Sequence, residues 1–261
     1  LVPCGTTGET PALTEEEDRL VVETVVRVAD GRVPVVAGTG SNSTDMAIKY
    51  TRMAEKAGAD GSLQVAPYYN KPTQEGLFRH FSAIAESTSL PLILYNIPGR
   101  TSVTLSAETT ARLAEIPNIV GIKDSTLSMN MVSDMKRLCG DDFDILSGDD
   151  PMTLPMMSLG GKGVISVASN VAPTAVSEMV KALNSGDFER ARELHYELLP
   201  LFRALFLETN PIPVKAAASL LGLCSDEMRL PLVPMSGENL RKLQRVMEES
   251  AHLLPTPEEV R

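Results

Sequence analysis

The sequence predicts an α/β fold in which short, buried, parallel strands alternate with amphipathic helices. Six apolar runs rich in β-branched residues recur along the first two thirds of the 261-residue chain, and longer segments with helical spacing separate them. Continuous apolar runs of this length fit strands that are buried on both faces of a parallel sheet. The alternation leaves two architectures, an open doubly wound sheet and a closed (β/α)₈ barrel.

The expected strands each end near a small or polar residue. They are predicted at residues 33–38, 61–66, 91–95, 118–123, 143–147 and 163–168. The run Leu1-Val-Pro-Cys4 resembles the end of one more strand. A barrel needs eight strands, so six full runs and one partial run leave both architectures open.

The segments between the strands have apolar residues at helical spacing. Thr14 is a capping residue, and Glu15, Glu16 and Glu17 follow it in the first turn, where acidic side chains suit the helix dipole. Helices are expected at residues 14–29, 43–57, 73–87, 106–114 and 173–184. Beyond them the pattern is purely helical, at residues 187–208, 212–221 and 237–253. We therefore expect an α/β part over residues 1–186 and a C-terminal helical region over residues 187–261 that packs on it.

Composition excludes several classes of function. Hydrophobic residues make up 43% of the chain and charged residues 22%, which is ordinary for a globular protein. The net charge of −10 argues against binding to nucleic acids or to anionic membranes. The sequence has neither an apolar run long enough to span a membrane nor a secretory signal. The three cysteines lie far apart, and we expect reduced, buried thiols and a cytoplasmic location.

Common ligand motifs are incomplete. Gly38 and Gly40 follow a strand, but Ser43 stands where the third glycine of a dinucleotide site is needed. The pair Asp149-Asp150 has the chemistry of a magnesium site. No third ligand is visible nearby, so capping of the following helix is the favoured interpretation.

Polar residues remain at the ends of the predicted strands, which is where parallel α/β folds bind ligands. Lys123 ends an apolar run, where desolvation favours the neutral amine that attacks a ketone to form a Schiff base. The alternative is a lysine whose head group reaches solvent. Tyr95 ends the preceding strand and is placed to carry protons beside Lys123, although an amphipathic tyrosine with a solvated hydroxyl has the same pattern.

Two further segments suit carboxylate ligands. The loop Gly5-Thr-Thr-Gly8 offers amides and hydroxyls ahead of a helix, or is a plain turn. Arg100 has the chemistry to bind a carboxylate through two parallel hydrogen bonds. The alternative is that it forms an ion pair on the surface.

Seven motifs in this order resemble the dihydrodipicolinate synthase family, and the resemblance runs from residue 1 to about residue 250. They are Gly5-Thr-Thr-Gly-Glu9, Pro67-Tyr-Tyr-Asn-Lys-Pro72, Tyr95-Asn-Ile-Pro-Gly-Arg-Thr101, Gly121-Ile-Lys-Asp-Ser125, Ser147-Gly-Asp-Asp150, Gly163-Val-Ile-Ser166 and Asn210-Pro-Ile-Pro-Val-Lys215. The resemblance implies a (β/α)₈ barrel over residues 1–186 that lacks the first strand and first helix of the family. Proteins of this family usually form a homotetramer and condense pyruvate with L-aspartate 4-semialdehyde in lysine biosynthesis. The resemblance implies no metal and no organic cofactor.

The resemblance also implies a role for each site residue. Lys123 is the Schiff-base lysine, and Tyr95 is the proton donor and acceptor. Thr7 and Tyr69 complete a hydroxyl relay, with Tyr69 reaching into the site of a neighbouring subunit.

The substrate-binding residues are implied in the same way. Thr6 and Thr7 hold the pyruvate carboxylate, and Arg100 binds the aldehyde substrate at the mouth of the site. Gly148 and Ile165 line the pyruvate pocket, mainly through their backbones.

Two other interpretations stay open. One is a sister Schiff-base aldolase, such as N-acetylneuraminate lyase or a 2-keto-3-deoxy sugar acid aldolase, although the Thr6-Thr7 pair and Arg100 favour the synthase. The other is an inactive product, because the chain lacks the first βα unit of the family, about 35–40 residues.

Inhibition by L-lysine is predicted to be weak or absent. Asn42 and Tyr68 match the lysine-feedback pocket of the family, but Glu15, Asp18 and Met46 depart from the well-known inhibited enzymes. Met46 offers no charge to pair with the ligand's ammonium group, and the two acidic residues repel its carboxylate. A steady-state titration with lysine measures this, and strong inhibition at low-millimolar lysine would contradict it.

Overall fold

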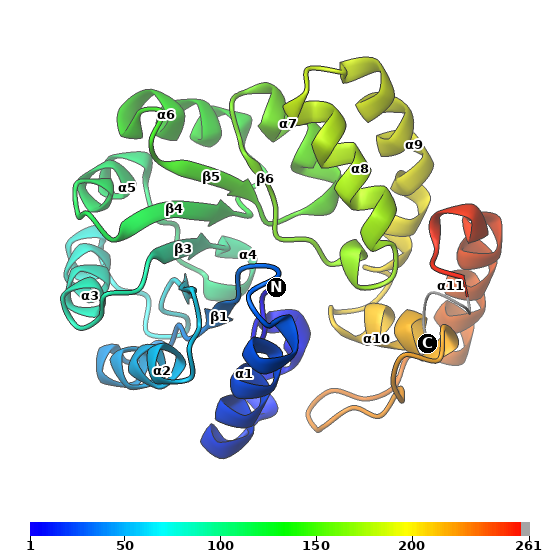
Figure 1. The fold of residues 1–261 in the computed structure, drawn as a ribbon, viewed down its shortest axis with the longest axis horizontal. Helices are drawn as coiled ribbons and strands as arrows, with labels where there is room; N and C mark the ends of the chain where they lie inside the picture. Colours follow the sequence, from blue (N-terminus) through cyan, green and yellow to red (C-terminus); the bar gives the residue numbers. More distant parts are fainter. Residues whose placement is uncertain (257–261) are drawn as a thin grey trace. The chain divides into compact units, whose positions relative to one another are not determined.

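A computed structural model describes residues 1–256, which pack as two compact units. The first unit holds Leu1–Gly148 and Leu159–Ile165, and it contains the whole β-sheet. Its six strands are all parallel and neighbour one another in chain order (Figure 1). They are β1 (Val36–Gly38), β2 (Gly61–Val65), β3 (Leu92–Asn96), β4 (Ile119–Asp124), β5 (Asp144–Ser147) and β6 (Gly163–Val164).

The sheet curls into a half-barrel with helices along it (Figure 1). An open doubly wound sheet reverses its strand order at a switch point, and this sheet does not, so the predicted barrel class is confirmed. The helices of this unit are α1 (Glu15–Ala29), α2 (Thr44–Lys56), α3 (Gln74–Glu86), α4 (Pro98–Thr101), α5 (Ala107–Ala114) and α6 (Met129–Cys139).

The first residues of the chain extend the sheet beyond β1. Val36 donates its backbone N–H to the carbonyl of Leu1 at 2.8 Å, and Gly38 donates to the carbonyl of Pro3 at 2.9 Å. This confirms that residues 1–4 continue the sheet as the sequence predicted. The loop that follows them, Gly5-Thr-Thr-Gly8, therefore starts at the carboxyl-end edge of the sheet.

Helix starts follow the predicted capping chemistry. Thr14 and Glu17 form a capping box at α1: the Thr14 hydroxyl accepts from the Glu17 amide at 3.3 Å, and the Thr14 amide donates to the Glu17 carboxylate at 2.8 Å. The serines before α2, α5 and α6 each accept one hydrogen bond from the amide of the third helical residue, without the reciprocal bond of a capping box. Each side chain satisfies an amide that the helix itself leaves unpaired.

The structure differs from the predicted elements at several places. The last strand stops at Val164 rather than residue 168, because the amides of Val167 and Ala168 donate to the Asp150 carboxylate, each at 3.0 Å. Helix α6 was not predicted, since only Val132 and Met135 form its buried stripe. The expected capping role of Asp149 is confirmed: its side chain accepts from the amide of Met152 at 3.3 Å.

The second unit holds Asp149–Ser158 and the described residues from Ser166 onward, and it is helical. Its α-helices are α7 (Thr153–Ser158), α8 (Pro173–Asn184), α9 (Phe188–Ala204), α10 (Ile212–Leu220) and α11 (Gly237–Glu249). Helices α9 and α11 end four residues before the predicted positions, and α7 was not predicted. The division at residue 186 stays a prediction.

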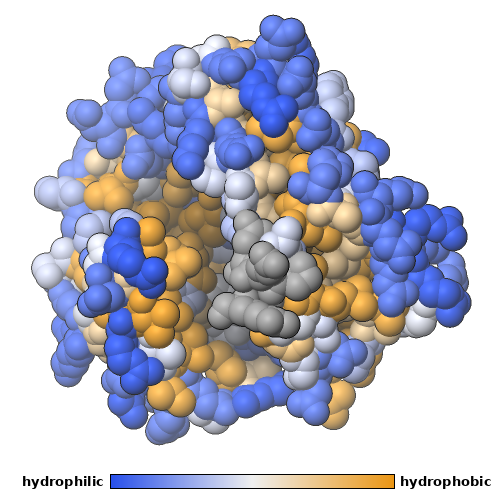
Figure 2. All heavy atoms as spheres, turned by 45° about the vertical axis from the view of Figure 1, so that its right-hand side comes forward, coloured by the Kyte–Doolittle hydropathy of each residue, from blue (hydrophilic) through white to orange (hydrophobic). Residues whose placement is uncertain are grey.

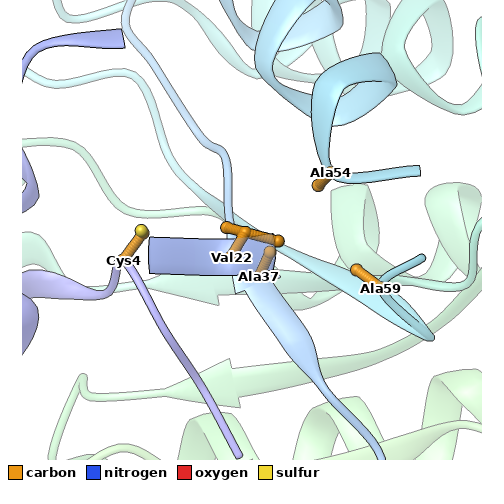
Figure 3. Packing of buried hydrophobic residues seen from close by; sticks show 5 residues of the cluster. All are labelled: Cys4, Val22, Ala37, Ala54 and Ala59. Carbon is orange, nitrogen blue, oxygen red and sulfur yellow. The ribbon is translucent and has the colours of Figure 1, made fainter. Parts of the chain in front are cut away.

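A small apolar cluster anchors the start of the chain. Cys4, which is 4% exposed, packs with Val22 of α1, Ala37 of β1 and Ala54 of α2 (Figure 3). Burial raises the pKa of the Cys4 thiol to about 12, so the thiol is protonated at neutral pH. Cys224, in contrast, is exposed, so the expectation of three buried thiols was wrong for this residue.

Apolar side chains also remain on the surface, as the orange areas of Figure 2 show. Leu20 and Val28 of α1 are about 60% exposed, and Leu230 is 81% exposed. Among residues 1–256, no helix combines the length and apolar character needed to cross a membrane.

His80 makes the stability of the fold depend on pH. Its ring is 6% exposed on α3, contacts Phe81 edge-on and shares a 2.9 Å hydrogen bond between Nδ1 and the Thr44 hydroxyl. Burial lowers the pKa of His80 from 6.5 to about 4. As pH falls from about 6.5 to about 4, the His80 ring binds a proton in the unfolded chain but stays neutral in the folded chain. This difference lowers the free energy of unfolding by about 3 kcal/mol.

His80→Asn is expected to remove this pH dependence while keeping a partner for Thr44. Urea unfolding of the wild type and the variant at several pH values measures the difference. His252→Asn is the matched control, because the His252 ring is 64% exposed. Equal slopes for the wild type and His80→Asn would contradict the assignment.

Candidate active site

The carboxyl ends of all six strands meet at one edge of the sheet, since the strands are parallel. Tyr95 and Lys123 sit at that edge in neighbouring strands, and the register pairs them directly. Residues that pair across two strands point to the same face. The two side chains therefore lie side by side, as the sequence predicted.

The contact between these two side chains is close and partly buried. The Lys123 ammonium nitrogen lies 4.1 Å from the centroid of the Tyr95 ring, over its face. Tyr95 is 6% exposed, and Lys123 is partly exposed. The negative face of the ring attracts the cation and more strongly so where water is excluded. This contact holds the end of Lys123 at a fixed place beside a phenol.

Gly148 forms a wall of the same site. Its amide donates to the carbonyl of Asp124 at 2.8 Å, just beyond the end of β5. A β-carbon at this position would lie 2.9 Å from Cε and 3.1 Å from Cγ of Lys123 and would collide with the Ser125 hydroxyl. Any larger residue here would displace the side chains of Lys123 and Ser125 from these positions. Ile165 lies beside this wall, and its amide donates to the carbonyl of Ser147 at 2.9 Å.

The loop with the two threonines lies at the same edge, next to β1. Thr6 and Thr7 begin a short 3₁₀ helix, Thr6–Gly8, whose preceding residues Gly5 and Cys4 lie against Gly38. A β-carbon on Gly38 would collide with the carbonyl of Cys4. Cys4 itself has a φ of 55°, which is a strained conformation for a residue with a side chain. Close approach of two backbones thus sets where this loop starts.

Arg100 and Tyr69 are more exposed to solvent than Tyr95 and Lys123. Arg100 lies on the single turn of α4, directly after β3, and is exposed. Tyr69 follows β2 with a φ of 72° and is 89% exposed. The structure thus brings Tyr95, Lys123 and Gly148 into contact, with Ile165 alongside. It places Thr6, Thr7 and Arg100 at the same edge of the sheet, while the Tyr69 ring projects into solvent.

The sequence analysis did not predict the polar side chains that lie behind Tyr95 and Lys123. Asn96 and Asp124 follow Tyr95 and Lys123, pair with each other in the register and are 0% and 1% exposed. Burial raises the pKa of the Asp124 carboxyl group, and hydrogen bonds from Thr126 and Asn96 oppose this rise. The available signal was a carboxylate that directly follows a strand-end lysine. Its meaning depended on the register of β3 and β4.

Gly148→Ala is expected to lower the free energy of unfolding by about 1–3 kcal/mol, because the new methyl group overpacks the space of Lys123. Urea unfolding measures the change. Gly237→Ala is the control, since a β-carbon there comes no closer than 3.8 Å to another group. A Gly148→Ala chain as stable as the control would contradict the steric argument.

Known proteins match this chain almost from end to end. Residues 1–250 match the model of the dihydrodipicolinate synthetase family. The 4-hydroxy-tetrahydrodipicolinate synthase of Thermodesulfovibrio yellowstonii is 56% identical over 250 residues, which cover 96% of this chain and 86% of that protein.

Two solved structures have the same fold. The dihydrodipicolinate synthase of Aquifex aeolicus superposes with a TM-score of 0.95 at 52% identity, covering 98% of this chain and 87% of that one. A monomeric dihydrodipicolinate synthase variant superposes with a TM-score of 0.95 at 46% identity, covering 97% of this chain and 86% of that one. With its motifs, its parallel sheet and these matches in agreement, this chain belongs to the dihydrodipicolinate synthetase family.

Proposed function

We propose that this chain is a lyase that condenses pyruvate with L-aspartate 4-semialdehyde to give 4-hydroxy-tetrahydrodipicolinate, in lysine biosynthesis. The observation that carries the proposal is the Lys123 amine, held 4.1 Å from the ring centroid of a buried tyrosine at the ligand-binding edge of a parallel sheet. The names of the relatives support the same reaction. They do not favour a sister aldolase.

The first half of the reaction forms a carbon nucleophile on Lys123. The neutral amine attacks the ketone carbon of pyruvate, and loss of water gives an imine. The protonated imine withdraws electrons, so the methyl group of pyruvate loses a proton and becomes an enamine. Tyr95 is the proposed donor and acceptor of these protons, because its phenol belongs to the ring that contacts Lys123.

The second half joins the substrates and frees the lysine. The enamine carbon attacks the aldehyde carbon of the second substrate and forms the new carbon–carbon bond. The amino group of that substrate then attacks the imine carbon, displaces the Lys123 amine and closes the ring. The products of this sequence are the cyclic alcohol, water and regenerated Lys123.

The remaining site residues have proposed roles that fit their positions. Thr7 and Tyr69 extend the proton path from Tyr95, and Thr6 with Thr7 holds the carboxylate of pyruvate. Gly148 and Ile165 line the pyruvate pocket through their backbones. Arg100 binds the carboxylate of the aldehyde substrate, for which its exposed place after β3 is suitable.

We further propose a homotetramer in the cytoplasm. The 89% exposure of Tyr69 supports a role in which its ring reaches the site of a neighbouring subunit. Because one solved relative is a monomeric variant, sedimentation of the purified chain is the direct measure of its assembly.

Incubation with pyruvate and borohydride is expected to add a pyruvate-derived mass to Lys123. Borohydride reduces the imine to a stable amine, and peptide mass spectrometry locates it. Lys162→Ala is the control variant, since Lys162 is exposed and lies outside the strand-end pair, and it should be labelled like the wild type. Label on Lys162, or no label in a folded protein, would overturn the proposed function.

Arg100→Ala is expected to weaken the use of aspartate semialdehyde while Schiff-base formation with pyruvate continues. Loss of a charge-assisted contact to a carboxylate costs about 1.5–3 kcal/mol. Steady-state kinetics with varied aldehyde, together with borohydride trapping, separates the two steps. An equal loss in both steps would mean that Arg100 has a structural role.

A further inference from the structure

The reactive pair has a second pair of side chains directly behind it. Asn96 and Asp124 are the residues after Tyr95 and Lys123, and they pair across β3 and β4 in the same register. Successive residues of a strand point to opposite faces of the sheet. Asn96 and Asp124 therefore lie on the far face, where they are 0% and 1% exposed.

The Asp124 carboxylate accepts hydrogen bonds from Asn96 and from Thr126. Asn96 donates its side-chain amide to Oδ1 at 3.3 Å. Thr126 donates its hydroxyl to Oδ2 at 2.7 Å and its backbone amide to the same oxygen at 3.2 Å. A carboxylate accepts all three bonds, whereas a neutral amide in its place has only one acceptor oxygen.

Asn96 has no freedom to reverse its side-chain amide. Its Oδ1 accepts from the backbone N–H of Leu105 at 3.0 Å, and its Nδ2 donates to the carbonyl of Leu105 at 3.0 Å. A flipped amide would place donor against donor and acceptor against acceptor. Asn96 therefore presents an N–H to residue 124 and requires an acceptor there.

Backbone hydrogen bonds join three strand ends at the same level. Gly148, after β5, donates to the carbonyl of Asp124 at 2.8 Å, and Ser125 donates to the carbonyl of Asn96 at 2.8 Å. Because Asp124 is covalently next to Lys123 and Asn96 is next to Tyr95, any shift between the two back-face residues shifts the two front-face residues as well.

We infer that Asp124 is a positioning residue: by holding Asn96 and Thr126 it fixes the separation of the Tyr95 ring and the Lys123 amine on the opposite face of the sheet. The inference rests on the proposed function, since it assigns a purpose to that contact. Asp124 touches no substrate in this role. It acts only through the geometry of the two strand ends.

Burial of the carboxyl group supports this role. Desolvation raises the pKa of Asp124, and the hydrogen bonds from Thr126 and Asn96 oppose this rise, so burial of this group is costly and its partners offset part of the cost. A buried polar group held against such a cost is typical of a functional site. The cost is met by the three donors, which fix the orientation of the carboxylate.

Asp124→Asn tests the inference with almost no change in size. If its oxygen faces the two Thr126 donors, its NH₂ group faces the Asn96 NH₂ group and the bond between β3 and β4 is lost. We expect the rate of borohydride-trapped imine formation at saturating pyruvate to fall roughly tenfold. The half-saturating pyruvate concentration should change less than threefold. The loop that we propose to bind the pyruvate carboxylate, Gly5-Thr-Thr-Gly8, lies next to β1 and not next to Asp124.

Two further variants serve as a fallback and a control. Thr126→Val removes one donor and keeps the backbone bond, so it tests the same network with a smaller slowing if Asp124→Asn does not fold. Ser62→Ala is the matched control: Ser62 is 0% exposed and hydrogen-bonds Thr39 at 2.6 Å in a separate buried cluster. It should lower the melting temperature without slowing imine formation.

A crystal structure of Asp124→Asn decides the inference independently of the reaction. We expect the Lys123 nitrogen to move away from the 4.1 Å position over the Tyr95 ring. An unchanged contact, or a trapping rate equal to that of the wild type, would overturn the inference even if pyruvate labels Lys123. Failure of the wild type to be labelled would instead overturn the proposed function. In that case the distance between the Lys123 nitrogen and the Tyr95 ring in the crystal structure of Asp124→Asn would still decide the positioning role.

Discussion

The parallel register between β3 and β4 is the constraint on which the site depends. It pairs Tyr95 with Lys123 on one face and Asn96 with Asp124 on the other. A slip of one residue would turn every side chain of one strand to the opposite face, so it would bury the lysine among helices and point a carboxylate at the tyrosine ring. Both the cation–ring contact and the hydrogen bonds behind it need the same register. Each pair therefore supports the other.

Close backbone approach is the second requirement, and it explains where glycine is needed. Gly148 leaves the space that the Lys123 side chain fills, and Gly38 lets the segment before the threonine loop lie against β1. At Gly38 a β-carbon would meet backbone atoms, which have little freedom to move, whereas at Gly148 it would displace the side chains of Ser125 and Lys123. The apolar cluster around Cys4 then holds the start of that loop against α1, β1 and α2. Close packing at these glycines and around Cys4 thus sets the positions of Lys123 and of the threonine loop.

Buried polar groups on the helix-facing side of the sheet give the site its rigidity at some cost to stability. Burial raises the pKa of Asp124, and hydrogen bonds donated by Asn96 and Thr126 oppose this rise. Thr39, Ser62 and Gln64 form a similar cluster between β1, β2 and α2. Such networks have few alternative arrangements, since each donor needs its acceptor. They hold the strand ends more rigidly than apolar packing alone would.

The sequence by itself determined the fold class, the order of strands and helices and most helix starts. The spacing of apolar residues and capping residues such as Thr14 act over a few neighbouring positions, so they can be recognised without the tertiary structure. It also predicted Lys123 and Tyr95 as a pair, because both end apolar runs that had to be neighbouring parallel strands. Only the tertiary structure decided what lies behind them. The partnership of Asp124 with Asn96 spans 28 positions of sequence, and the early end of β6 depends on Asp150, 17 positions before Val167. Bonds of this kind form only after the strands have paired, so no local pattern of residues encodes them.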